Sequence, residues 1–226
     1  MSVLALSGWA QYAASLDAIL PDNALKVEYG DCTSVEAVFN RIQSANIAEP
    51  DVAIGWSLGG QLLVRAIAAG VIAPKHLVLL GAPYQVVADK YFKAGKNKFT
   101  IGASRLALKV NADAMLQQFQ ADLLAKGDSN SAHIKAIAPQ YLAPSDCNAW
   151  LFWFDELERF SCRDLKLSNF PPTTIVHGKN DAVIPYPNSL EFADKIKNST
   201  LHSLENCGHA PHWHDTNFVK SIIPAS

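Results

Sequence analysis

The segment Gly55-Trp56-Ser57-Leu58-Gly59-Gly60 contains the clearest candidate for a catalytic nucleophile. It follows an apolar run at residues 52–55, which predicts a buried strand, and leads into residues 58–69, whose apolar positions have helical spacing. Glycines on both sides of a serine allow the sharp strand-to-helix turn, called a nucleophile elbow, that exposes the hydroxyl group. The helix N-terminus also leaves the main-chain N–H of Leu58 available to an oxyanion. The alternative is that Ser57 is only a small helix N-cap.

A serine needs a general base, and the base needs an acid that orients it. Asp181 follows a predicted strand at residues 173–177, and His209 follows another at residues 201–204, directly after Gly208. The chain order serine, aspartate, histidine is the one that accompanies a nucleophile elbow. Because parallel strands end at one edge of a sheet, we expect Ser57, Asp181 and His209 to meet there.

Other roles for these residues remain open at this point. Asp181 is also a plausible turn residue, and His202, His212 and His214 compete with His209 as the base. His209 is favoured because it alone follows a glycine directly after a strand and a loop. We expect His212 and His214 at the rim of the site. Their H-x-H spacing suits a metal, but no third ligand is evident, so we expect no metal and no cofactor.

The loop after the first predicted strand, residues 3–6, is expected to supply a second oxyanion donor. It reads Ser7-Gly8-Trp9-Ala10, and the main-chain N–H of Trp9 is the natural candidate. We expect the Trp9 indole to form a wall of the acyl pocket, with core packing as the alternative. For Trp56, core packing and substrate contact both remain open.

Short apolar runs that alternate with helical segments predict the fold. Such alternation indicates an α/β protein whose mostly parallel sheet, of about six strands, is flanked by helices. The predicted strands are residues 3–6, 25–29, 52–55, 76–80, 173–177 and 201–204. The predicted helices between and after them are residues 12–20, 35–45 with Ser34 as N-cap, 58–69, 189–196 and 217–223.

Residues 84–167 break this alternation and are predicted to be helical at 106–124, 132–137 and 149–160. We predict a core formed by residues 1–83 and 168–226, with residues 84–167 as an inserted helical cap, or lid. A lid would shape a substrate pocket and exclude water. The alternative is an ordinary bundle of packing helices.

Composition narrows the class of protein. Of 226 residues, 49% are hydrophobic and 18% are charged, which favours a globular core over disorder. The net charge of −2 argues against a globally basic nucleic-acid binder. The four cysteines form no C-x-x-C pair, and no apolar run reaches the length of a membrane span. We therefore expect a cytoplasmic monomer with reduced thiols and neither nucleic-acid nor membrane partners.

Taken together, these motifs resemble the α/β-hydrolase family across essentially the whole chain. Gly8-Trp9, the double glycine of the elbow and the helical insertion ahead of the acid are similar to the pimeloyl-ACP methyl ester carboxylesterases of biotin synthesis. That family hydrolyses the methyl ester of pimeloyl attached to acyl carrier protein and releases methanol. This chain departs from it at Ser7-Gly8-Trp9-Ala10, where the family usually has His-Gly-Trp-Gly.

The resemblance assigns roles to individual residues. It implies a Ser57–Asp181–His209 triad and oxyanion and acyl contacts at Trp9 and Leu58. It also implies that a five-residue stretch of the cap contacts the pimeloyl chain, and its nearest counterpart here is Phe119, Gln120, Ala121, Asp122 and Leu123.

A basic segment supplies a separate argument for an acidic partner. Asp89 is the only acidic residue between positions 84 and 109, where the basic residues are Lys90, Lys93, Lys96, Lys98, Arg105 and Lys109. Such a patch would steer an acidic acyl carrier protein, and a solvated lysine face is the alternative. Two functions remain as alternatives to the hydrolysis of the pimeloyl methyl ester. One is a general short-chain esterase or acyl thioesterase with the same triad, and the other is a catalytically silent binding module.

Overall fold

In the part of the chain that the structure describes, the sheet has six strands, and every neighbouring pair is parallel. The computed structural model describes residues 1–142 and 147–224, so residues 143–146 and 225–226 of the predicted cap and core lie outside it. In spatial order the strands are β2 (Leu25–Lys26), β1 (Val3–Leu6), β3 (Val52–Trp56), β4 (His76–Leu80), β5 (Thr173–Gly178) and β6 (Ser199–Leu204). The predicted fold class is confirmed.

The strand order reverses next to β1, which has β2 on one side and β3 on the other. In open parallel sheets a crevice forms at such a point, outside the carboxyl ends of the strands. The register pairs Leu6 with Gly55 and Trp56 with Leu80, so β1, β3 and β4 end close together. The loops that follow these strands therefore share one edge.

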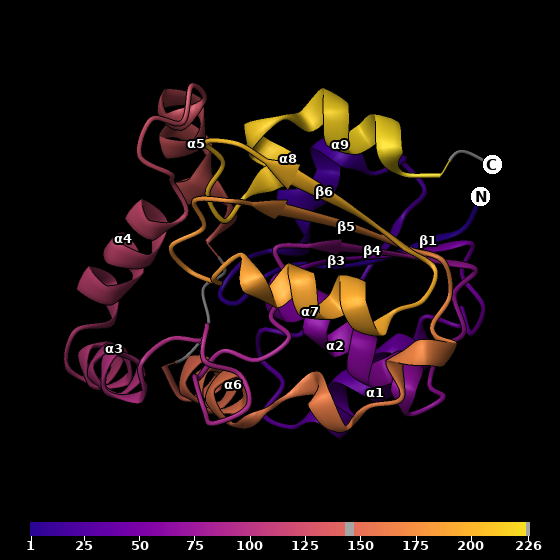
Figure 1. Ribbon diagram of the computed structural model, residues 1–226, viewed down its shortest axis with the longest axis horizontal. Coiled ribbons are helices and arrows are strands. Elements are labelled where there is room, and N and C mark those ends of the chain that lie inside the picture. The colour runs from indigo at the N-terminus through magenta and orange to yellow at the C-terminus, as the bar shows by residue number, and fades with distance from the viewer. Residues whose placement is uncertain (143–146, 225–226) are drawn as a thin grey trace.

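Helices cover both faces of the sheet (Figure 1). On one face lie α1 (Val35–Ser44), α2 (Leu58–Ala68) and α7 (Pro187–Lys195). On the other lie the 3-10 helix η1 (Ala13–Ile19), α8 (Pro211–His214) and α9 (Thr216–Ile222). The Ser34 hydroxyl accepts from the Ala37 N–H at 3.1 Å, which confirms the predicted N-cap of α1.

The segment between β4 and β5 adds no strand to the sheet in its described part, and its main helices gather beyond the carboxyl ends of the strands (Figure 1). These helices are α3 (Lys98–Val110), α4 (Ala112–Asp122), α5 (Ser131–Ile137) and α6 (Cys147–Arg159). They are accompanied by the 3-10 helices η2 (Ala138–Tyr141), η3 (Cys162–Asp164) and η4 (Leu167–Asn169). The division into core and cap at the stated boundaries stays a prediction.

The single helix predicted at residues 106–124 is wrong. The chain forms α3 and α4 with a break at Asn111, whose φ of −153° and ψ of 88° are not helical. The Asn111 side chain accepts from the Ala114 N–H at 3.0 Å and so caps α4. Asparagine competes with the helix for main-chain donors, which explains why a continuous apolar pattern was interrupted here.

Two other elements differ from expectation. The helix predicted at residues 12–20 is a 3-10 helix, and the strand predicted at residues 25–29 pairs only at Leu25 and Lys26. This is an edge strand, and Leu25 is 41% exposed. In the described parts of the chain, no helix is both long and apolar enough to cross a membrane.

The elbow glycines supply a stability test. A Cβ on Gly59 would lie 2.3 Å from the main-chain oxygens of both Leu6 and Ser7, whereas a Cβ on Gly102 in α3 would meet nothing within 4 Å. We expect Gly59→Ala to lower the free energy of unfolding by about 3 kcal/mol or more, because main chain must move. Gly102→Ala is the matched control and should raise it by about 0.5–1 kcal/mol. Urea unfolding measures both, and equal effects would contradict the close packing of the elbow.

Candidate active site

Ser57 lies between β3 and α2 with a φ of 52°, in the left-handed region that non-glycine residues rarely adopt. The turn is this tight because its neighbours lack side chains: a Cβ on Gly55 would lie 2.4 Å from the Gly60 Cα. The Ser57 N–H donates to the Leu80 carbonyl at 2.8 Å, which holds the turn to β4. The hydroxyl makes no cap hydrogen bond to α2, so it is free for another partner.

A hydrogen-bonded chain joins the three residues predicted to form the triad. His209 Nε2 lies 2.8 Å from the Ser57 hydroxyl, and His209 Nδ1 lies 2.7 Å from Asp181 Oδ2. The side chains of His209 and Asp181 are fully shielded from solvent. A neutral His209 with its proton on Nδ1 would donate to the carboxylate and accept from the serine hydroxyl. This is the arrangement that lets a serine lose its proton as it attacks an ester.

The Asp181 carboxylate stays ionised although it is buried. Burial alone would raise its pKa, but His209 and His177 outweigh that effect, and the pKa of Asp181 lies well below its ordinary value. Its other oxygen, Oδ1, accepts from the main-chain N–H groups of Val183 and Ile184, both at 2.8 Å. An ionised acid beside the base is what orientation of a histidine requires.

His177 is part of the site, although no role was predicted for it from the sequence. Its Nε2 lies 2.9 Å from the Ile184 carbonyl oxygen and 3.1 Å from Asp181 Oδ2. A carbonyl oxygen only accepts, so Nε2 carries the proton and also faces the carboxylate. The available signal was its place at the end of a buried strand, four residues before Asp181.

His209 is held on both sides of its main chain. Its N–H donates to the Leu123 carbonyl at 2.9 Å, and its carbonyl accepts from Trp56 Nε1 at 2.8 Å. Gly208 makes the first contact possible, because a Cβ there would lie 2.3 Å from the Leu123 oxygen. Trp56 is fully buried and does not line the cavity, so it packs in the core and holds His209 through the hydrogen bond from its Nε1.

The histidines that competed with His209 lie elsewhere. The prediction that His212 lies at the rim is wrong, because its ring is fully buried 4.6 Å from the Trp56 ring. His214 Nδ1 lies 2.9 Å from Asp128 Oδ1, whereas Asp181 is paired with His209. Among the described residues, no three histidines, cysteines or acids are grouped so as to hold a metal ion.

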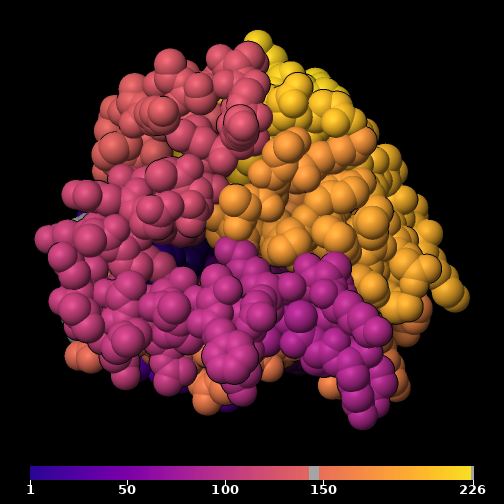
Figure 2. Space-filling view, turned by 60° about the vertical axis from the view of Figure 1, so that its left-hand side comes forward, coloured from indigo at the N-terminus to yellow at the C-terminus, as the bar shows by residue number. Residues whose placement is uncertain are grey.

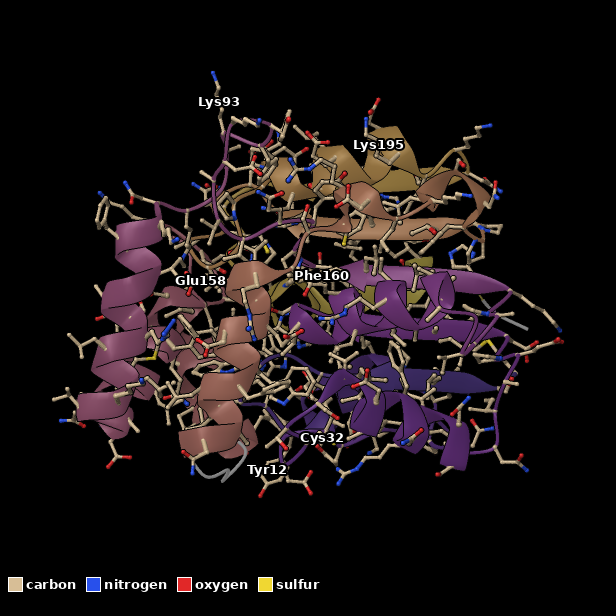
Figure 3. All side chains as sticks on the ribbon, turned by 90° about the horizontal axis from the view of Figure 1, so that it is seen from below. Tyr12, Cys32, Lys93, Glu158, Phe160 and Lys195 are labelled. Carbon is tan, nitrogen blue, oxygen red and sulfur yellow. The ribbon has the colours of Figure 1, made fainter. Side chains whose placement is uncertain are left out.

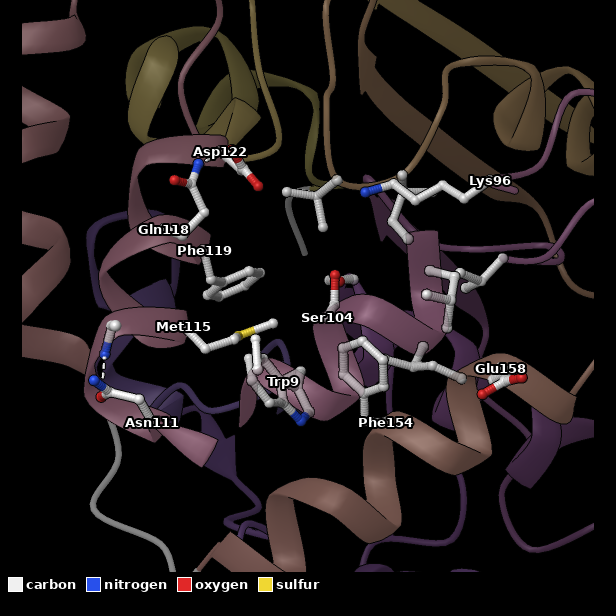
Figure 4. A pocket seen from close by; sticks show the side chains of 18 of the residues that line it. Trp9, Lys96, Ser104, Asn111, Met115, Gln118, Phe119, Asp122, Phe154 and Glu158 are labelled. Atoms are coloured by element: carbon white, nitrogen blue, oxygen red, sulfur yellow. Dashed lines mark hydrogen bonds between the residues drawn. The ribbon is translucent and has the colours of Figure 1, made fainter. Parts of the chain in front are cut away.

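A cavity of about 410 Å³ reaches Ser57. Figure 2 shows a hollow between the segment that carries α3 and α4 and the part of the chain after β5, with N-terminal atoms in indigo at its floor. Most of the wall is apolar, and its aromatic members are Trp9, Phe119 and Phe154 (Figure 4). The Trp9 ring packs edge-on against Phe119 at 5.1 Å, and its Nε1 donates to the Trp150 carbonyl at 3.0 Å. The structure thus places the Trp9 indole in the wall.

The five-residue stretch assigned to the acyl chain lies only partly in the wall. Phe119 and Asp122 line the cavity, whereas Gln120, Ala121 and Leu123 do not. A helix presents one face, and the wall residues of α4 follow that spacing: Ala114, Met115, Gln118, Phe119 and Asp122. A consecutive stretch was therefore the wrong pattern, and helical periodicity was the signal that would have corrected it.

The two predicted oxyanion donors differ in how they meet the cavity. Trp9 lines it, whereas the Leu58 side chain is fully buried and does not. Within the described residues, neither the Trp9 nor the Leu58 N–H has a main-chain or side-chain hydrogen-bond partner. Both groups are thus available, and their role as oxyanion donors stays a prediction.

The structure divides the predicted basic patch. Lys96 lines the cavity, and Arg105 pairs with Asp155 at 3.2 Å and Glu158 at 3.5 Å. The other four members are exposed, and they are Lys90, Lys93, Lys98 and Lys109. Lys93 extends away from the body of the protein (Figure 3). The six residues therefore do not form one surface.

Comparison with known proteins agrees with this fold. A family model described as alpha/beta hydrolase fold matches residues 18–216. The chain is 27% identical over 179 residues to a pimeloyl-[acyl-carrier protein] methyl ester esterase of Neisseria meningitidis, covering 78% of this chain and 56% of that protein. It is 22% identical over 180 residues to the Chromobacterium violaceum esterase of the same name, covering 79% and 71%. The chain thus spans little more than half of the first relative.

A solved esterase from Exiguobacterium antarcticum has the same fold. The two structures superpose with a TM-score of 0.83 over 99% of this chain and 90% of that one, at 18% identity. At this identity the likeness concerns the fold alone.

His212 should make the stability of the protein depend on pH. Burial lowers its pKa to about 3, from 6.5. The neutral ring therefore stabilises the fold fully above pH 6.5, and this contribution is lost as the pH falls towards 3. Between pH 7 and pH 5 we expect His212 to reduce the free energy of unfolding by about 2 kcal/mol.

Urea unfolding at both pH values would measure this effect in wild type, in His212→Asn and in His133→Asn, which replaces an exposed histidine of α5. The His212 variant should lose less stability on acidification than the other two proteins. The same pH dependence in all three would show that His212 is not the group responsible.

Proposed function

The chain belongs to the α/β hydrolase family, and on that premise we propose that it is a serine carboxylesterase. Ser57 is the nucleophile, His209 the general base and Asp181 the acid that orients it. The observation that carries the proposal is the continuous hydrogen-bonded chain of these three side chains at the cavity, with distances of 2.8 Å and 2.7 Å.

In the proposed mechanism, His209 Nε2 takes the proton of Ser57 as the hydroxyl oxygen attacks the ester carbonyl carbon. The main-chain N–H groups of Trp9 and Leu58 donate to the oxyanion of the tetrahedral intermediate. The His209 imidazolium then protonates the departing alcohol, and an acyl-enzyme remains on Ser57. A water molecule, deprotonated by His209, attacks the acyl carbonyl, and collapse of the second intermediate returns the proton to Ser57.

We propose the methyl ester of pimeloyl-acyl carrier protein as the substrate, with methanol as the leaving alcohol. The names of the two curated relatives support this choice. So does the largely apolar wall of the cavity, which suits a methylene chain. The same proposal places the enzyme in the synthesis of the biotin precursor and in the cytoplasm.

The exposed face of α3 suits an acidic carrier protein. Phe99, Leu106 and Val110 are 87%, 60% and 77% exposed, and they share one side of the helix by their spacing. Lys98 and Lys109 are exposed beside them. Apolar contacts flanked by positive charge would hold a partner that offers a helix with acidic and apolar residues.

The helices α3, α4 and α6 supply most of the cavity wall. We propose that residues 84–167 act as a cap over a core of residues 1–83 and 168–226. Such a cap would keep bulk water from the acyl-enzyme while the alcohol leaves.

A general short-chain esterase or acyl thioesterase is the second candidate. The ion pairs of Arg105 with Asp155 and Glu158 favour it, because they neutralise part of the basic segment that a carrier protein would need. Both candidates use the same triad and differ only in what recognises the substrate.

Ser57→Ala tests the chemistry. We expect it to reduce hydrolysis of pimeloyl-acyl carrier protein methyl ester and of a p-nitrophenyl ester by about 10⁴-fold or more. The far-UV spectrum should stay unchanged, and a fluorophosphonate should label wild type but not the variant. Ser44→Ala, an exposed serine in α1, is the control. Wild-type turnover by Ser57→Ala would exclude the mechanism, and no labelling of wild type would favour a silent binding module.

The carrier surface is tested by reversing charge on α3. In Lys98→Glu/Lys109→Glu, the ratio of kcat/KM for the carrier-bound ester to that for free methyl pimelate should fall about tenfold or more. Lys197→Glu/Lys220→Glu changes the charge equally on exposed residues after α7 and in α9, and should keep the wild-type ratio. An equal ratio in all three proteins would favour the short-chain esterase.

A further inference from the structure

One charged side chain in the cavity wall stands out from its surroundings. Among the described residues that line the cavity, Lys96 is the only cation. Its side chain reaches into the cavity opposite Asp122 (Figure 4). Of the two acidic wall residues, Glu158 is engaged by Arg105 at 3.5 Å, and Asp122 Oδ1 accepts from Gln118 Nε2 at 2.8 Å. Within the described residues, no carboxylate oxygen lies within 4.0 Å of the Lys96 ammonium.

The main chain fixes Lys96 at this position. Its N–H donates to the Val86 carbonyl at 2.7 Å, and its carbonyl accepts from the Ala88 N–H at 2.9 Å. The preceding residue has to be glycine, because a Cβ on Gly95 would lie 2.5 Å from the Ala88 nitrogen. Asn97, the next residue, caps α3 through the Phe99 N–H at 2.8 Å. Lys96 is therefore anchored on both sides, unlike an ordinary surface lysine.

Lys96 is half-buried and shares the cavity wall with apolar residues. The wall beside it includes Val86, Ile101 and Ile184, which form a small buried cluster. Burial lowers the pKa of Lys96, although the charges of Asp122 and Asp181 act in the opposite direction. An ammonium group that has lost part of its hydration and has no ion pair gains most from a ligand that offers an oxygen acceptor.

We propose that Lys96 binds an oxygen acceptor at the far end of the acyl chain, so that the cavity selects esters derived from dicarboxylic acids. This inference rests on the proposed function, since it concerns the acyl group delivered to Ser57. The ester carbonyl lies at Ser57, the methylene chain follows the apolar wall, and a carboxylate at the other end binds the Lys96 ammonium. In a carrier-linked chain, the thioester carbonyl takes the place of the carboxylate.

Asp122 contributes to the selection between acyl chains. Its carboxylate faces the cavity from the wall opposite Lys96 and repels an anionic end group that approaches α4 (Figure 4). A chain with a methyl end group leaves the Lys96 ammonium without an acceptor, which costs part of its binding energy. The two charges therefore favour one orientation of a dicarboxylic chain and penalise a monocarboxylic one.

The test compares kcat/KM for monomethyl pimelate and methyl heptanoate, which have the same chain length and differ in the far carboxylate. Monomethyl esters of the four- to eight-carbon diacids extend the series. We expect wild type to prefer monomethyl pimelate about tenfold or more. In Lys96→Met the preference should fall to about one and the dependence on diacid length should flatten, whereas Lys96→Arg should keep a preference. Lys126→Met, an exposed lysine before α5, is the control and should keep the wild-type preference.

The outcomes separate this inference from the proposed function. Hydrolysis without a preference for the half ester, or a preference that persists in Lys96→Met, would overturn the role of Lys96 and leave the esterase intact. If wild type hydrolyses no ester, binding decides instead. Calorimetry with monomethyl pimelate should then show about tenfold weaker binding in Ser57→Ala/Lys96→Met than in Ser57→Ala. Equal binding by the two variants would overturn the inference.

Discussion

The close approach of α2 to the end of β1 sets the geometry of the site. A Cβ on Gly59 would lie 2.3 Å from the Leu6 oxygen, so the first turn of α2 rests directly on the main chain of β1. The same contact brings the loop after β1 beside the elbow, where a Cβ on Gly8 would lie 3.3 Å from the Ser57 Cβ. The strained φ of Ser57 persists because β3 and α2 hold it from both sides.

A buried carboxylate is the second requirement, and several donors offset its desolvation. Two main-chain N–H groups hold one oxygen of Asp181, while His209 and His177 face the other. His209 is in turn held by Trp56, the last residue of β3, and by Leu123, from the segment between β4 and β5. The position of the base therefore depends on both the sheet and the inserted helices. A displacement of the chain after α4 would therefore shift His209 Nε2 relative to Ser57.

The sequence predicted the residues whose positions follow from strand ends. Ser57, Asp181 and His209 each come after an apolar run, and glycines at 55, 59 and 208 mark where main chain approaches main chain. Residues placed by long-range packing could not be found this way. His212 lies in the interior because Trp56 and Trp213 enclose it, and nothing in the local pattern distinguishes it from a rim residue. The break at Asn111 was missed because the apolar pattern continues through it.

The place of Lys96 in the cavity wall could not be predicted from the local sequence either. Lys96 is one of six basic residues between positions 84 and 109, and its main-chain hydrogen bonds to Val86 and Ala88 and its place in the cavity wall distinguish it from its exposed neighbours. The proposed chemistry uses atoms at the carboxyl ends of strands, whereas the wall that meets an acyl chain comes largely from α3, α4 and α6. Substitutions on the inner faces of these helices change the wall without touching the contacts of Ser57 or Asp181. Substrate choice can therefore vary while the triad stays fixed, and for this reason the chemistry of such a chain is easier to predict from its sequence than its substrate.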